Sequence, residues 1–96
     1  MLTNLSTDDH TIREMMTTLN ETHDNLMIRL AEQVPTMKKD DLMVYCYLAH
    51  RLDHMTLCTI LNRTPGVLNA KVYRIREKIR KSGAQDADAF LDAICN

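Results

Sequence analysis

Apolar residues recur at heptad spacing through the first third of the chain, a pattern typical of a coiled-coil seam. We expect the helix to start near Ser6 or Thr7, where Asp8 and Asp9 suit the positive end of a helix dipole. No glycine or proline interrupts it before Pro35, so we expect one helix of about 27 residues. The predicted seam consists of six apolar residues: Leu5, Ile12, Met16, Leu19, Leu26 and Leu30.

The length of this helix predicts a role for the seam. At 1.5 Å per residue the helix spans roughly 40 Å, whereas a compact globule of this chain length is about 30 Å across. Part of the seam would then extend beyond the core of its own chain. We therefore expect residues 1–36 to form a coiled-coil-like arm that pairs in a homodimer. The alternative is an arm that folds back along the rest of the chain, with a break near Thr17–Asn20.

Four further helices are expected within a domain of residues 37–96. Asp53 is suited to cap the second of them, and Thr64 to cap the third with Pro65 at its first position. Gly83 suits the left-handed conformation that ends a helix. The predicted ranges are Lys39–Leu52, His54–Asn62, Pro65–Lys81 and Asp86–Ile94. The whole chain is thus expected to be all-α, a long N-terminal helix followed by a four-helix domain.

Composition agrees with this fold class and excludes others. Two glycines and two prolines are too few for the tight turns of an all-β fold. The longest apolar run, Leu42–Ala49, is far shorter than the roughly 20 residues that cross a bilayer. The polar, acidic N-terminus has no signal-peptide pattern. We expect a cytoplasmic protein with no membrane partner and with reduced cysteines.

The net charge of −1 hides a strong segregation of charge along the chain. Residues 1–36 carry two arginines against six acidic residues, and residues 84–96 carry three aspartates and no cation. Residues 37–83 carry ten cations against four acids, and six of the ten lie within Lys71–Lys81. A basic block between acidic ends favours a surface that faces a polyanion, although an ordinary solvated helix face is the alternative.

The helix expected over 65–81 has one apolar edge and one face suited to DNA. At 100° per residue its buried edge is Leu68, Val72, Ile75 and Ile79. The opposite face carries small and amide side chains suited to base edges in a major groove: Gly66, Asn69, Ala70 and Tyr73. The residues expected to contact phosphates are Thr64, Lys71, Arg74, Arg76, Lys78 and Lys81.

The stretch RLDHMTLCTILNRTPGVLNAKVYRIREKI, residues 51–79, resembles the LuxR/GerE-type helix-turn-helix and is similar to the hairpin of sigma-factor region 4. The preceding stretch LAEQVPTMKKDDLMVYCYLAHRL resembles the C-terminal part of bacterial tetratricopeptide-linked transcriptional regulators. The matching positions include Leu52, Leu57, Cys58, Leu61, Thr64, Pro65, Arg74, Ile75, Arg76, Lys78 and Ile79.

This resemblance implies a sequence-specific DNA-binding regulator of transcription that inserts residues 65–81 into the major groove of double-stranded DNA. RNA polymerase or a sensor domain would be further partners. The alternative is a helix-turn-helix-fold interaction module that binds another regulator or a sigma factor without touching DNA, since one fold serves both roles.

The sequence favours neither a metal site nor a catalytic site. Cys46, His50, His54 and Cys58 recur every four residues, as zinc ligands would on one continuous helix, but a turn at Asp53 would separate them. The sequence has no phosphate-binding glycine loop and no nucleophile motif. We therefore expect no cofactor, no metal and no enzymatic activity.

Overall fold

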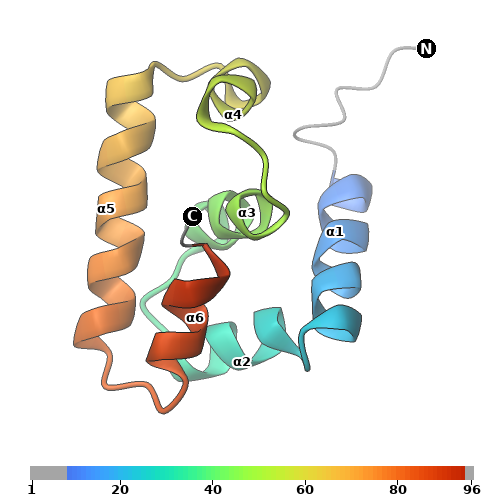
Figure 1. The fold of residues 1–96 in the computed structure, drawn as a ribbon, viewed down its shortest axis with the longest axis vertical. Coiled ribbons are helices and arrows are strands. Elements are labelled where there is room, and N and C mark those ends of the chain that lie inside the picture. Colours follow the sequence, from blue (N-terminus) through green and yellow to red (C-terminus); the bar gives the residue numbers. More distant parts are fainter. Residues whose placement is uncertain (1–8, 95–96) are drawn as a thin grey trace.

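Six helices surround a single core in the computed structural model, which describes residues 9–94. No strand occurs within that range, so the all-α expectation is confirmed. In Figure 1, α3 lies at the centre, with α1 on one side of it and α5 on the other. The helices are α1 (Asp9–Thr22), α2 (Leu26–Gln33), α3 (Lys39–Ala49), α4 (His54–Leu61), α5 (Pro65–Lys81) and α6 (Ala87–Ala93).

The single long N-terminal helix is wrong, because the chain breaks between α1 and α2. Asp24 and Asn25 adopt left-handed φ angles of 53° and 60°, which no continuous helix allows. Asn20 stabilises the turn, since its Oδ1 accepts the N–H groups of Met27 at 2.9 Å and Ile28 at 3.2 Å. An asparagine carbonyl that satisfies helix-start donors in this way competes with helix continuation. The arm folds back, as in the alternative, but breaks a few residues later.

Most of the predicted dimer seam is therefore occupied within the chain. Leu19, Leu26 and Leu30 are each at most 2% exposed and belong to the common core. Ile12 and Met16 are half-buried against the same core, and Leu5 lies outside the described residues. The radius of gyration, 12.9 Å, is close to the roughly 12.5 Å expected of a compact chain of this length. The described part of the arm shares the core of the rest and does not project from it.

Polar contacts between α2 and the start of α6 hold the predicted arm against the rest of the chain. Gln33 Nε2 donates to Asp86 Oδ2 at 2.7 Å, and the Asp86 N–H donates back to Gln33 Oε1 at 3.0 Å. Arg29 adds an ion pair to the same carboxylate at 2.9 Å. Beneath them, Tyr45 of α3 donates its hydroxyl to the carbonyl of Phe90 in α6 at 2.7 Å. The contacts to Asp86 thus connect the predicted arm to the predicted domain, and the Tyr45–Phe90 bond connects two helices within that domain.

Helices α3 to α6 match the four predicted helices closely. α3 ends at Ala49, three residues before the predicted end, and Arg51 is left-handed with φ 67°. Asp53 caps α4 as expected, accepting the Thr56 N–H at 2.7 Å. Thr64 caps α5 by accepting the Val67 N–H at 3.3 Å. The chain leaves α4 through a left-handed Asn62, so that a short link of residues 62–64 turns it into α5.

Candidate nucleic-acid interface

The outer face of α5 is built as the helical periodicity predicted. Its inner edge, formed by Leu68, Val72, Ile75 and Ile79, is at most 5% exposed and packs into the core. On the opposite side all four predicted base-reading residues are exposed: Gly66, Asn69, Ala70 and Tyr73. Because α4 and α3 hold the apolar edge, the outer face is left open to a partner.

One flank of α5 differs from the prediction, because two expected phosphate contacts point inward. Lys71 Nζ lies 2.5 Å from Asp41 Oδ1 and 3.0 Å from Asp40 Oδ2. Lys78 Nζ lies 2.5 Å from Asp41 Oδ2 and also donates to the carbonyl of Thr36 at 3.1 Å. Ammonium groups held by carboxylates are not available to DNA phosphates. Lys71 and Lys78 are therefore removed from the phosphate-contact set.

Asp41 is the centre of this charge cluster. Among the residues that the structure describes, it is the only buried acid. The residue is 1% exposed, and it also accepts the Lys38 N–H at 3.0 Å. Burial alone would raise its pKa, but the Lys38 N–H and the ammonium groups of Lys71 and Lys78 outweigh burial and lower the pKa to about 2. Asp41 is thus charged at neutral pH and fixes α5 to the start of α3.

Asp40 extends the cluster to the link before α5. Arg63 Nη2 donates to Asp40 Oδ1 at 2.7 Å, and Lys71 contacts the other oxygen. Burial raises the pKa of Asp40, but the hydrogen bonds and positive charges of Arg63 and Lys71 outweigh burial. The pKa of Asp40 is therefore below its usual value. Sequence reasoning missed both acids, although a signal was present. Lys71 and Lys78 are seven residues apart and lie on the helix flank nearest the buried edge.

The remaining predicted phosphate residues are placed differently from one another. Arg74 is exposed and makes no ion pair with any residue from 9 to 94. Arg76 is half-buried on the other flank, where it lines a hollow with Arg51, Asp53 and His54. Lys81 is exposed but lies 3.7 Å from Glu77. Thr64 is exposed while its Oγ1 caps α5.

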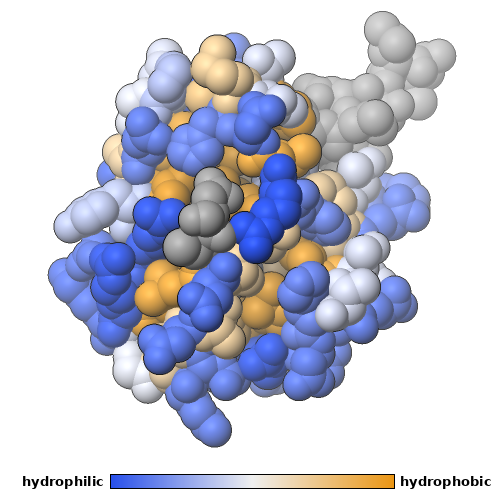
Figure 2. All heavy atoms as spheres, viewed as in Figure 1, coloured by the Kyte–Doolittle hydropathy of each residue, from blue (hydrophilic) through white to orange (hydrophobic). Residues whose placement is uncertain are grey.

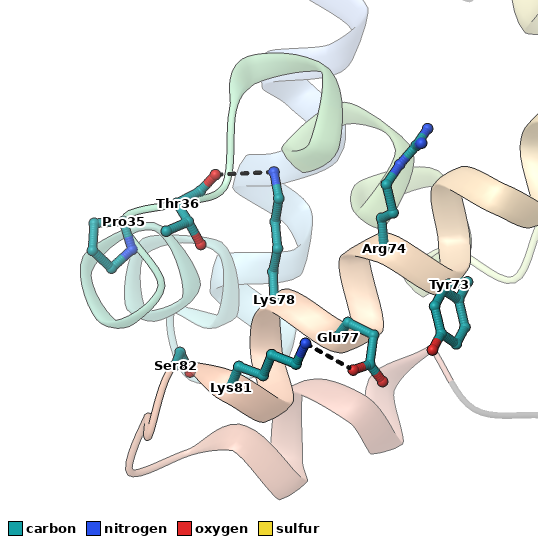
Figure 3. A pocket seen from close by; sticks show the side chains of 8 residues that line it. All are labelled: Pro35, Thr36, Tyr73, Arg74, Glu77, Lys78, Lys81 and Ser82. Atoms are coloured by element: carbon teal, nitrogen blue, oxygen red, sulfur yellow. Dashed lines mark hydrogen bonds and ion pairs between the residues drawn. The ribbon is translucent and has the colours of Figure 1, made fainter.

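A groove runs between this face and the segment that joins α2 to α3. Figure 3 shows Pro35 and Thr36 on one wall, with Tyr73, Arg74 and Glu77 on the α5 side. Lys78 spans the floor to Thr36, whereas Arg74 extends away from the helix (Figure 3). In Figure 2 hydrophilic residues cover most of the α5 edge of the molecule, with smaller apolar patches between them. The groove borders the predicted base-reading face.

The spaced Cys and His residues do not share a helix. Cys46 lies on α3 and Cys58 on α4, both buried, and the chain turns between them as predicted at Asp53. His50 Nε2 instead hydrogen-bonds the carbonyl of Met15 at 2.9 Å. Within the described residues no group of three or more His, Cys, Asp or Glu side chains is arranged to hold a metal ion. Among these residues there is also no helix with the length and apolar character of a membrane span.

Comparison of the chain with protein-family models, with curated proteins and with solved structures gives no match in any of the three.

Proposed function

We propose that this protein binds double-stranded DNA as a transcriptional regulator, with α5 in the major groove and α4 bracing it against the backbone. The observation that carries the proposal is the outer face of α5. Asn69, Tyr73 and Arg74 are exposed together on a helix whose opposite edge is locked into the core. A rigid, externally open helix after a short link is the arrangement that reads a groove about 12 Å wide.

The cations left outside the Asp40–Asp41 cluster define the phosphate contacts of the proposal. Arg74, Arg76 and Lys81 remain from the predicted set, and they lie in the C-terminal half of α5. Cations at the end of a recognition helix suit the phosphates that flank the groove, which fix position without reading sequence.

The homodimer remains a prediction, with a smaller candidate surface. Leu19, Leu26 and Leu30 are already buried, whereas Ile12 and Met16 border an open groove with Leu42 and Met43 of α3. Pairing through α1 would leave α5 unobstructed, because α1 and α5 lie on opposite sides of α3 (Figure 1).

A protein-interaction module is the second candidate. Two observations favour it: Lys71 and Lys78 are neutralised internally, and three apolar or aromatic side chains are exposed on α4 and α5. These are Met55, Val67 and Tyr73, which are 71%, 53% and 62% exposed. Exposed aromatic and methionine side chains are enriched at protein interfaces.

A salt-dependent binding titration with a matched pair of variants tests the proposal. Fluorescence anisotropy would follow a labelled duplex pool with the wild-type protein, Arg74→Ala and Arg13→Ala. Both substitutions remove one exposed arginine, but Arg13 lies on α1, away from α5. Because Arg13 also lines the α1 groove, the sedimentation of both variants is compared with that of wild type before the titration. Each phosphate contact contributes about 0.9 to the slope of log K against log salt. We expect Arg74→Ala to flatten the slope by about that amount and Arg13→Ala to match wild type. No duplex binding at low salt would refute the proposal and favour the interaction module.

A further inference from the structure

The half of the outer α5 face that would meet base edges carries no charge. Between Pro65 and Tyr73 the only basic residue is Lys71, and its side chain is held by Asp40 and Asp41 on the flank of the helix. The exposed side chains over this span include two apolar ones, Val67 and Ala70, and one amide, Asn69. Gly66 has no side chain, and a Cβ built there would meet nothing within 4 Å. An uncharged reading face is therefore a property of the folded chain and not of the sequence alone.

The ion pairs of Lys71 keep its charge away from the outer face of α5. Its side chain is 18% exposed and is held by two carboxylates, one of them buried Asp41. Burial lowers the pKa of Lys71, but Asp41 and Asp40 outweigh burial and raise it, so the ammonium group stays charged and paired. To reach a base edge Lys71 would have to leave both acids, and Asp41 would remain buried with one partner fewer.

The chemistry of base edges turns this neutrality into a preference. Guanine is read in the major groove by arginine or lysine on O6 and N7, which is the commonest specific contact. An asparagine amide instead pairs with N6 and N7 of adenine, and small apolar groups contact the methyl group of thymine. The first turns of α5 offer the second set of groups and none of the first.

We propose that α5 selects A·T base pairs, with Asn69 reading adenine and with Val67 and Ala70 contacting thymine methyl groups. This inference rests on the proposed DNA-binding function and adds its sequence class. The preference is set in part by Asp40 and Asp41, which hold Lys71, the single cation between residues 65 and 73, away from the groove.

The first test removes the thymine methyl group without changing base pairing. Sites are selected from a random duplex library with the wild-type protein, and deoxyuridine then replaces thymine within the selected core. Loss of one buried methyl group is expected to weaken binding about fourfold per contacted thymine. Deoxyuridine outside the core serves as the control and is expected to leave affinity unchanged. Val67→Thr, which is nearly isosteric on an exposed position, is expected to reduce the effect of deoxyuridine.

The second test changes the reader itself. Asn69→Ala is expected to reduce the preference for adenine at one position by about tenfold, and Asn69→Arg to shift that position toward guanine. Asn69 is exposed, so neither variant is expected to alter the melting temperature appreciably.

The outcomes separate this inference from the function on which it rests. An A·T-rich selected core, weakened by internal deoxyuridine, supports both. A G·C-rich core, or a core whose affinity is unchanged by deoxyuridine and by Asn69→Ala, overturns the A·T inference and leaves DNA binding in place. Failure to bind any duplex overturns both.

Discussion

Asp41→Asn is the substitution whose effect the structure defines most sharply. The asparagine keeps the shape of the side chain but removes the charge that holds Lys71 and Lys78. Removing one partner of a buried ion pair costs about 3–5 kcal/mol when the other partner stays buried and uncompensated. Here the two lysine side chains are 18% and 29% exposed, so each can reach water by a rotamer change. This relaxation places the expected cost at the low end of that range or below it.

The pKa of Asp41 gives a second value for the same cost. A folded-state pKa of about 2, against 3.8 for an ordinary aspartate, corresponds to about 2 kcal/mol of stability. Both routes converge on roughly 2–3 kcal/mol, out of about 5–15 kcal/mol for a domain of this size. A loss of this size lowers the melting temperature by roughly 10–20 °C.

The sign of the pH dependence follows from the direction of the pKa shift. Because the folded-state pKa is lowered, the stabilisation by Asp41 is present above about pH 4 and is lost as pH falls toward 2. The difference between wild type and Asp41→Asn is therefore expected to be largest near neutral pH and to narrow below pH 4.

Urea denaturation followed by far-ultraviolet circular dichroism measures this difference at several pH values. Asp40→Asn is the matched control, since Asp40 is adjacent, carries the same charge and is 40% exposed. The control is expected to cost less than about 1 kcal/mol, as partly exposed ion pairs do. If Asp41→Asn unfolds at the same urea concentration as wild type at pH 7, the central role given to the Asp41 cluster is refuted.

Three further predictions concern residues outside the Asp40–Asp41 cluster. Gly66→Ala is expected to leave the fold intact or stabilise it by up to about 1 kcal/mol, because a Cβ there meets nothing within 4 Å. The same variant is expected to bind DNA more weakly, since the added methyl group would lie between the helix and the base edges. An unchanged DNA affinity would argue against a close approach of Gly66 to the bases. Leu30→Ala is expected to destabilise the chain by about 2–5 kcal/mol, and the loss in melting temperature relative to wild type should be the same at every protein concentration, since Leu30 is buried within one chain. A loss that changes with protein concentration would instead place Leu30 at a dimer interface. Met16→Glu is expected to reduce the dimer fraction measured by analytical ultracentrifugation, because Met16 lines the α1 groove. Ile28→Glu, at an exposed position on α2, is the control. Equal sedimentation of the two variants would exclude the α1 groove as the dimer surface.

The helices from α3 onward were predictable because their ends are encoded locally. Asp53, Thr64 and Pro65 are capping and first-turn residues, and each acts in the folded chain as its type predicts. The outer and inner faces of α5 were predictable for a similar reason, since an apolar edge with a period of 3.6 residues fixes the opposite face.

The arrangement of α1 and α2 was not predictable from periodicity, because a dimer arm and an arm folded back on its own chain share one hydrophobic pattern. A heptad stripe can pair with a second chain or be buried against its own, and the choice depends on contacts distant in sequence. Asn20 and the left-handed Asp24 and Asn25 end α1, yet none of these residues is a strong helix breaker such as proline. Gln33 and Asp86, which are 53 residues apart, then hold α2 in place.

The phosphate-contact set was only partly predictable, since the orientation of a lysine depends on what lies beside it. Lys71 and Lys78 look like solvated cations in the sequence, and only the position of Asp41 against α5 turns them inward. Arg74 lies further around the helix from the buried edge and is exposed.

DNA binding by the outer face of α5 is tested most directly by mapping amide chemical shifts in ¹⁵N-labelled protein titrated with duplex DNA at moderate salt. We expect the largest changes at Gly66, Asn69, Ala70, Tyr73 and Arg74, with small changes along α1. Shifts confined to α1 and α2, or no shifts on adding any duplex, would contradict the assignment of the outer α5 face as the DNA-binding surface.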